Sequence, residues 1–243
     1  MGSLARLNFK AMPFSELSAR VSEVRSRIQR ALERGGRGQD VTIVAVTKTH
    51  GADAVLAAWE CGLGDVGENR VQEALAKMDE VRAVEVPVVP IRWHLIGHLQ
   101  RNKVKALERF SLFHALDSAR LADSANDFGL ERNRPVDVLV QVNVSGESPK
   151  GGFAIEDLRA ESTRMAVMTG LRVKGVMTMA RLDADEAELR RTFSAARDAR
   201  AILSDAGHGA TELSMGMSGD YEIAVEEGAT MVRLGTTLFG ARD

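Results

Sequence analysis

One lysine, Lys48, ends an apolar stretch that reads VTIVAVTKTH at residues 41–50. β-Branched residues fill its first four positions, which is typical of a buried strand. If the strand leaves Lys48 partly buried, its ammonium loses hydration. This favours the neutral amine, a nucleophile that can form a Schiff base with an aldehyde. The alternative is a surface lysine whose ammonium stays in water. Position alone favours the surface lysine, so other residues must decide.

Two later segments have features of a phosphate-binding site. They read ELSMGMSGD at residues 212–220 and VRLGTTLFG at residues 232–240, and each places small residues and hydroxyls where a helix would begin. Backbone N–H groups at helix starts and in glycine turns bind phosphate. Taken singly, a serine there could be only a helix cap and a glycine only a turn residue. The pair of segments favours a phosphate site, and its candidate residues are Ser214, Ser218, Gly235 and Thr236.

An arginine interrupts the last apolar run, MVRL at residues 231–234. As the penultimate residue of a strand, Arg233 would point either into the interior of the fold or outward to a helix. Inside, its guanidinium could hold a phosphate or donate to a ring nitrogen. Outside, it would form an ion pair with a neighbouring helix. The sequence leaves both possibilities open.

Eight short apolar runs, with helical stretches between them, must position these residues. The runs lie at residues 41–46, 65–67, 92–96, 112–116, 136–144, 173–177, 212–215 and 231–234. Apolar residues at three- and four-residue spacing predict helices over 53–61, 70–81, 99–108, 118–129, 155–168, 184–206 and 220–227. Another amphipathic helix precedes the first run, with an apolar face made of Leu17, Val21, Val24, Ile28 and Leu32.

Strands that alternate with helices predict a parallel sheet, because each parallel neighbour requires a crossover connection. Eight such units predict a single-domain α/β fold, a (β/α)8 TIM barrel with an extra N-terminal helix. A doubly wound sheet is the alternative. No linker or compositional shift divides the chain. We assign residues 12–243 to the barrel and treat residues 1–11 as a tag remnant or unstructured extension.

In such a barrel the loops that follow the strands meet at one face, where active sites lie. A Schiff-base lysine after the first strand, a phosphate site after the seventh and eighth strands and a nearby arginine predict a pocket for pyridoxal 5′-phosphate (PLP). The residues at the strand ends and in the loops after them that could line this pocket are Lys48, Asn69, His94, Met177, Ser214, Met215, Ser218, Arg233, Gly235 and Thr236.

Two histidines, His94 and His98, are four residues apart, a spacing seen in metal sites on helices. Their segment reads WHLIGH and predicts a strand that runs into a turn at Gly97, so the two rings would not share a helix face. The chain has no HExxH motif and no obvious third ligand. We therefore assign no metal ligand.

Composition disfavours several classes of protein. The formal net charge is -2 and the basic residues do not cluster, which disfavours nucleic-acid binding. The single cysteine, Cys61, cannot form an internal disulfide, which fits a reducing compartment. No apolar run approaches the roughly 20 residues of a membrane span, and the N-terminus lacks a signal-peptide pattern. We expect a cytoplasmic protein without a membrane partner.

Six segments carry a family resemblance along nearly the whole chain: AVTKTH, GENRVQEALAK, RWHLIGHLQRNK, VNVSGESPKGGF, GVMTMA and ELSMGMSGDYEIAVEEGATMVRLGTTLFG. With these segments in this order, the chain resembles the pyridoxal phosphate homeostasis protein family, also called the YggS or PROSC family. The resemblance implies a fold like the N-terminal barrel domain of alanine racemase and PLP bound as a Schiff base to Lys48. It further implies that the phosphate lies near Ser214, Gly235 and Thr236, with Asn69 and Arg233 near the cofactor.

Three functions follow from these observations. The leading hypothesis, in line with the resemblance, is a carrier without turnover or catalytic residues that buffers PLP or delivers it to PLP-dependent apo-enzymes. Such a protein would maintain vitamin B6 and amino-acid homeostasis. The second is a PLP-dependent racemase of the alanine racemase type, which needs an acid or base such as Tyr221, His94 or His98. The third is a sugar-phosphate isomerase or aldolase that uses Lys48 without a cofactor.

Overall fold

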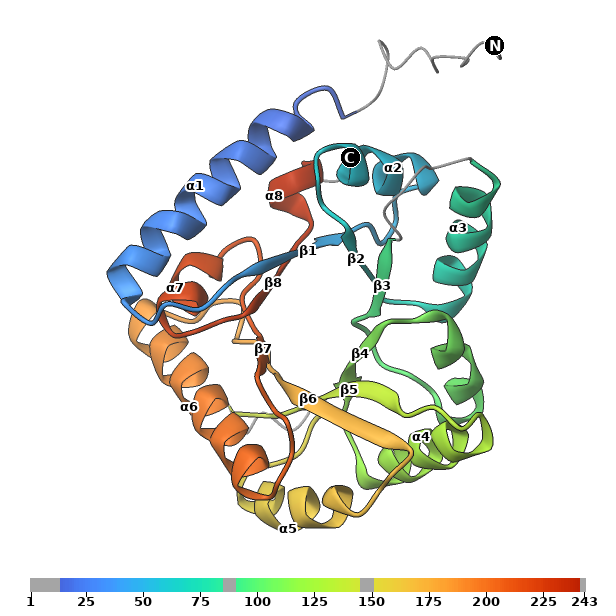
Figure 1. The fold of residues 1–243 in the computed structure, drawn as a ribbon. Coiled ribbons are helices and arrows are strands. Elements are labelled where there is room, and N and C mark those ends of the chain that lie inside the picture. The colour runs from blue at the N-terminus through green and yellow to red at the C-terminus, as the bar shows by residue number, and fades with distance from the viewer. Residues whose placement is uncertain (1–13, 85–90, 145–150, 241–243) are drawn as a thin grey trace.

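The computed structural model describes residues 14–84, 91–144 and 151–240. The extension expected at residues 1–11 lies outside the described residues. Eight parallel strands close into one barrel in sequence order, β1 to β8, and helices surround it (Figure 1). The predicted (β/α)8 barrel is confirmed. The doubly wound alternative is wrong, because β1 pairs with β8 and leaves the sheet without an edge.

The strands lie close to the apolar runs of the sequence. They are β1 (Thr42–Val46), β2 (Asp65–Glu68), β3 (Arg92–Leu95), β4 (Leu112–Leu116), β5 (Val136–Gln141), β6 (Leu171–Met177), β7 (Glu212–Ser214) and β8 (Met231–Leu234). β5 ends three residues earlier than predicted, and the next residue, Val142, makes an isolated parallel bridge with Phe153. β6 begins two residues earlier than predicted, because Leu171 pairs with Val136.

Helices follow the strands and cover the outside of the barrel. The predicted additional helix is α1 (Leu17–Gly35), and the others are α2 (Ala52–Glu60), α3 (Val71–Ala83), α4 (Ala119–Glu131), α5 (Ile155–Ala166), α6 (Glu186–Asp205), α7 (Tyr221–Glu226) and α8 (Thr236–Phe239). Between β3 and β4 the chain forms a 3-10 helix, η2 (Arg101–Arg109), where we predicted an α-helix. Leu107 is the buried residue of this segment, so little apolar packing stabilises a longer helix there.

Strand register places polar residues inside the barrel. Partners in a parallel pair face the same side of the sheet. Val44 of β1 pairs with Asp65 of β2 on one side and with Arg233 of β8 on the other, so these three share a face. His94 of β3 pairs with Gly67, two residues after Asp65, and therefore shares that face too. The interior thus carries charged and polar groups where TIM barrels are mostly filled by aliphatic side chains.

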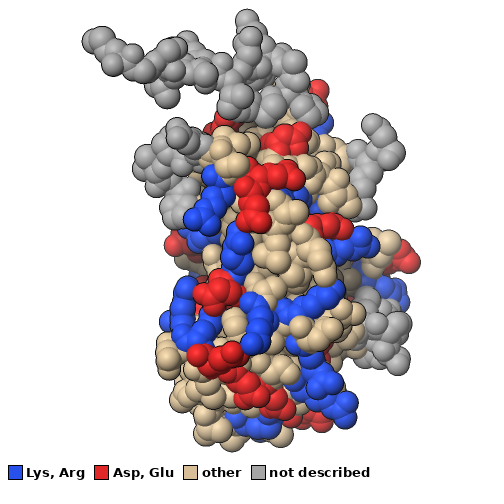
Figure 2. Space-filling model, turned by 90° about the vertical axis from the view of Figure 1, so that its right-hand side faces the viewer, with Lys and Arg blue, Asp and Glu red and all other residues tan. Residues whose placement is uncertain are grey.

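Charged residues of both signs lie interspersed on the face that carries α3 and α4 (Figure 2). Such mixing is typical of a solvated protein surface. Within the described ranges, the structure contains no helix that combines the length and apolar character needed to cross a membrane.

Ion pairs at Glu226 connect α7 to α1 and to α6. Glu226 of α7 accepts hydrogen bonds from Arg34 of α1 and from Arg190 of α6, both at 2.6 Å. The Glu226 side chain is 12% exposed. Burial alone would raise the pKa of Glu226, but the two arginines outweigh burial and lower the pKa below its ordinary value of 4.5.

We expect Glu226→Gln to reduce the free energy of unfolding at neutral pH by about 1 kcal/mol, a modest loss because solvent screens the partly exposed Arg190. Since the folded pKa is depressed, the carboxylate stabilises the fold above pH 4.5. This contribution is lost as the pH falls through the lower folded pKa. Urea unfolding at neutral and acid pH measures the effect. The wild type and the variant should converge in acid, and a gap that widened there would contradict the assignment.

Candidate functional site

Lys48 follows β1 and is half-buried, and the residue before it, Thr47, contacts the buried ion pair of Lys77 and Glu68. Glu68, the last residue of β2, accepts hydrogen bonds from Lys77 Nζ of α3 at 2.5 Å and from Thr47 Oγ1 at 2.6 Å. Lys77 also donates to the backbone carbonyl of Thr47 at 2.9 Å. These three residues hold together the ends of β1 and β2, from which Lys48 and Asn69 continue.

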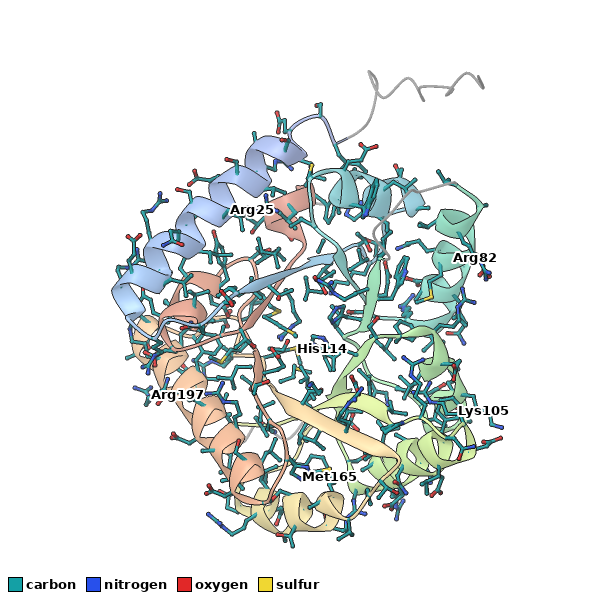
Figure 3. The ribbon with its side chains drawn as sticks, in the orientation of Figure 1. Arg25, Arg82, Lys105, His114, Met165 and Arg197 are labelled. Atoms are coloured by element: carbon teal, nitrogen blue, oxygen red, sulfur yellow. The ribbon has the colours of Figure 1, made fainter. Side chains whose placement is uncertain are left out.

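A chain of hydrogen bonds crosses the interior of the barrel from β2 to β8, and His114 of β4 lies at its centre (Figure 3). Asp65 Oδ1 is 2.9 Å from His94 Nε2, and His94 Nδ1 is 2.8 Å from His114 Nε2. His114 Nδ1 is 2.9 Å from Ser214 Oγ on β7. Arg233 Nη1 of β8 then donates to the same Ser214 oxygen at 2.6 Å. All five residues are buried.

Each end of this chain has a further partner. At one end, Arg92 Nε donates to Asp65 Oδ1 at 2.7 Å, and the Arg92 side chain is 58% exposed. At the other end, Arg233 Nη2 donates to the backbone carbonyl of Thr178 at 2.9 Å. The chain of hydrogen bonds therefore connects a solvent-exposed arginine on β3 with a buried arginine on β8.

Burial and neighbouring charges set the protonation states of three residues in this chain of hydrogen bonds. Burial, with smaller effects of His94 and Arg233, lowers the pKa of His114 well below its ordinary value, so this imidazole is neutral. Burial would raise the pKa of Asp65, but hydrogen bonds from His94 and Arg92 outweigh it and lower that pKa. Burial lowers the pKa of Arg233 to about 10, so the guanidinium is charged at neutral pH.

Hydrogen bonds join the loop after β7 to α8, the short helix that follows β8. Thr237 N donates to Ser218 Oγ at 3.2 Å, and Thr237 Oγ1 donates to the Ser218 carbonyl at 3.5 Å. Gly216, in the first loop, has a φ of +92°, and a Cβ there would lie 2.7 Å from the Cβ of Ala224. Only glycine fits such a position. The segments ELSMGMSGD and VRLGTTLFG therefore meet, as a shared phosphate site requires.

The short helix α8 begins at Thr236, directly after Gly235, and has no side-chain cap at its first residue. The first amides of a helix lack acceptors within the helix. Thr236 is exposed and Gly235 is half-buried. Thr237 N already donates to Ser218 Oγ, and the Thr236 amide and hydroxyl are donors that suit an anion at the mouth of the barrel.

The structure brings most of the sequence-predicted residues together at the strand ends. Ser214 and Arg233 bond to each other inside the barrel, which decides for Arg233 between an interior and an outward orientation. Met177 pairs with Ser214 in register and so shares its face of the sheet. Met215 lies just beyond β7 and is fully buried in the hydrophobic core. Half-buried residues at the strand ends and loops include Lys48, Asn69 and Ser218.

His94, which we predicted beside the cofactor, has both ring nitrogens engaged by Asp65 and His114. The structure therefore connects His94 with the candidate site through His114 and Ser214. The sequence reasoning missed Asp65 and His114. In the run LFHAL, the alternation of side chains along a strand puts His114 on the same side as Leu112 and Leu116, which indicates a buried histidine. Nothing in the sequence indicated its hydrogen-bond partners.

The other two acid or base candidates lie in different surroundings. Tyr221 is 2% exposed, and the guanidinium carbon of Arg27 on α1 lies 5.6 Å from its ring centroid. Its hydroxyl has no hydrogen-bond partner among the described residues, and burial raises its pKa. His98 is exposed and its Nδ1 lies 2.7 Å from Asp117 Oδ2.

Comparisons with known proteins identify the family. The family model of the alanine racemase N-terminal domain matches residues 20–243. The pyridoxal phosphate homeostasis protein of Pseudomonas aeruginosa is 39% identical over 231 residues, which cover 94% of this chain and 97% of that relative. The chain belongs to the pyridoxal phosphate homeostasis protein family. The resemblance predicted from the six sequence segments is thereby confirmed.

Comparison with solved structures agrees with this family assignment. PipY of Synechococcus elongatus PCC7942, solved with PLP bound, is 35% identical, with a TM-score of 0.80 over 92% of this chain and all of PipY. Alanine racemase from Corynebacterium glutamicum is 14% identical, with a TM-score of 0.68 over 91% of this chain and 61% of the racemase. The second likeness shows the fold alone and confirms the alanine-racemase-like barrel.

The groups at the strand ends of this homeostasis-family protein fit PLP in their chemistry. Lys48 offers an amine for the aldehyde. The joined loops after β7 and β8 offer hydroxyl and amide donors for the phosphate, at Ser218 and Thr236. Arg233, held by Ser214 Oγ inside the barrel, offers a fixed cation. An amine, an anion site and a cation are the donor set that PLP requires.

Proposed function

We propose that this protein binds PLP as a Schiff base on Lys48 and buffers or delivers it, and so maintains intracellular vitamin B6 and amino-acid homeostasis. The observation that carries the proposal is the pairing of β1 with β8, which closes the barrel. It sets the end of β1, where Lys48 follows, beside the end of β8, where Gly235 and Thr236 follow. Amine and phosphate donors thus belong to neighbouring strand ends.

Lys48 would act through its neutral amine. Its nitrogen would take the place of the aldehyde oxygen of PLP in a C=N bond, and that oxygen would leave as water with the two amine hydrogens. The reaction is reversible by the same water, which suits a protein that holds and releases its ligand. When bound, PLP supplies the reactive aldehyde that PLP-dependent enzymes use for amino-acid chemistry.

The other residues of the site would hold PLP without reacting. We propose phosphate contacts from Ser218, Gly235 and Thr236 in the loops after β7 and β8. Arg233 and Ser214 would face the ring from the barrel interior, and Asn69 and Met177 would line the adjoining strand ends. Met215 is proposed only as support, because it is buried in the hydrophobic core.

We propose a carrier in preference to a racemase, because the acid or base candidates are otherwise engaged. The Tyr221 ring is buried against Arg27 of α1. His94 has both ring nitrogens in hydrogen bonds, and His98 is exposed and paired with Asp117. The curated relatives in this comparison are named homeostasis proteins. Apo-enzymes that require PLP are the proposed recipients, and the cytoplasm is the expected compartment.

Reductive trapping tests the linkage. Borohydride treatment of the protein incubated with PLP should fix the adduct, and peptide mass mapping should place it on Lys48. A Lys105→Ala protein is the control, because Lys105 is an exposed lysine on η2 that pairs with Glu131. It should give the same mapped peptide as the wild type. An adduct on any other lysine, or none, overturns the proposed site.

Isotope exchange tests the choice between carrier and racemase. The PLP-loaded protein is incubated with single amino-acid enantiomers in deuterated water, and α-hydrogen exchange is followed by mass spectrometry. A carrier without a base on the free face of the ring should show exchange no faster than free PLP. Sustained exchange with inversion would favour the racemase. Transfer of PLP to an apo-enzyme, read as regained activity of that enzyme, tests delivery separately.

A further inference from the structure

We propose that Asp65, His94 and His114 are positioning residues, a relay of hydrogen bonds with one direction that fixes Ser214 as an acceptor and so aims Arg233 at bound PLP. The contact with PLP rests on the proposed function. The relay itself rests on the four distances across the barrel interior. None of the three residues needs to touch the ligand.

The direction of the relay follows from its two ends. The Asp65 carboxylate only accepts, so His94 must donate from Nε2. Arg233 only donates to Ser214 Oγ, so the Ser214 hydrogen must point to its other partner, His114 Nδ1. His114 is neutral and therefore carries its proton on Nε2, from which it donates to His94 Nδ1.

This order makes Ser214 a hydrogen-bond acceptor for Arg233 of β8. Its hydrogen is committed to His114, so its oxygen presents lone pairs to Arg233, and Arg233 Nη1 donates to it at 2.6 Å. Each of these hydrogens has an acceptor, and Asp65 Oδ1 accepts from Arg92 Nε as well as from His94 Nε2. A hydrogen-bond network of this kind, with all its members buried, holds them in one geometry.

The relay matters to Arg233 because it supplies one of two anchors for the guanidinium. Nη1 is held by Ser214 and Nη2 by the carbonyl of Thr178. Two anchors fix the orientation of a planar group, and a guanidinium has five N–H donors in total. The donors that remain would be directed toward the ligand. Without the Ser214 anchor, the plane could rotate about the bond to Thr178.

Charges along the relay agree with this order. Asp65 is ionised and held by Arg92, and His114 is neutral because it is fully enclosed. The acidic Asp220 lies close enough to Arg233 to favour its charged form. A protonated His114 would place a second cation beside Arg233 in a buried site, which is unfavourable.

Nitrogen-15 NMR of histidine-labelled apo-protein tests the relay without any ligand. The ring signals of His94 and His114, assigned with single His→Gln variants, should both show a proton on Nε2 and a bare Nδ1 at neutral pH. A proton on Nδ1 of His114 would overturn the proposed direction, because Ser214 could then no longer donate to it.

PLP titration of matched variants tests the consequence. His114→Phe keeps the bulk of the ring but removes both hydrogen bonds, so we expect PLP affinity to fall by about tenfold or more. His114→Gln can donate to His94 and accept from Ser214 as the imidazole does, and it should stay within about threefold of the wild type. The absorption spectrum of bound PLP and its pH dependence should change in His114→Phe and be restored in His114→Gln.

Leu112→Ala is the control for a merely structural role. Leu112 precedes His114 by two residues on the same strand face and is buried, but it makes no polar contact. Its truncation should lower stability while PLP affinity and spectrum stay unchanged. If His114→Phe binds PLP like the wild type, or if Leu112→Ala loses as much affinity, the relay is refuted while the proposed function stands. Wild-type protein that forms no adduct on Lys48 refutes the proposed function instead.

Discussion

Replacing Lys48 with alanine is expected to abolish the visible absorption band that the wild-type protein forms with PLP. The alanine side chain cannot form the C=N bond, and noncovalent contacts to the phosphate and ring do not produce that band. Lys77, the buried lysine nearest in the sequence, cannot substitute, because it is committed to Glu68 and to the carbonyl of Thr47. Titration with PLP, followed by absorbance, measures the effect.

Folding should be nearly unaffected by the same change. Lys48 is only half-buried and follows the strand, so its removal leaves no cavity in the core. Circular dichroism and the melting temperature of the apo-protein are the controls. A Lys48→Ala protein that keeps its full band and its fold would show that another amine holds PLP, and a Lys48→Ala protein that unfolds would assign the residue to stability.

Replacing Lys77 with methionine is expected to reduce the free energy of unfolding by about 3–5 kcal/mol. The change leaves the Glu68 carboxylate, which is 0% exposed, without its counter-ion. One oxygen of this carboxylate, Oε2, already has no hydrogen-bond partner among the described residues. Urea unfolding of the apo-protein at neutral pH measures the loss.

A second substitution distinguishes a lost ion pair from a general packing defect. Glu68→Gln in the Lys77→Met background removes the unpaired charge and keeps an acceptor for Thr47, so the double variant should regain most of the stability. Asp79 lies on α3 like Lys77, and Asp79→Asn, which breaks its exposed pair with Arg109 of η2, should change little. A double variant less stable than Lys77→Met would refute the ion-pair explanation.

Much of the fold could be predicted from local patterns. Period-two and period-3.6 spacing of apolar residues reports which segments form strands and helices, because it reflects burial of one face at a time. The eight runs therefore correspond to β1 to β8, and the helix with Val21 and Val24 on its apolar face is α1. Element ends were less predictable. β5 ends at Gln141, and the next residue, Val142, forms an isolated bridge with Phe153, a contact that local sequence patterns do not predict.

In the candidate site, too, some residues were recognisable from local sequence and others were not. Lys48, Ser218, Gly235 and Thr236 were recognisable because their types and their places after strands point to amine and phosphate chemistry. The role of His94 was not recognisable in this way. Its partners Asp65 and His114 lie 29 and 20 residues away in the chain, on neighbouring strands.

The sequence alone determined the order of the strands and helices, the polar residues at the strand ends and the family of this protein, since each is written in short segments. The tertiary structure decided which buried polar groups meet. His114 and Ser214 are 100 residues apart, and they bond only because closure of the barrel brings β4 and β7 to face each other across its interior. Buried donors and acceptors must pair, but local sequence does not specify with which distant partner.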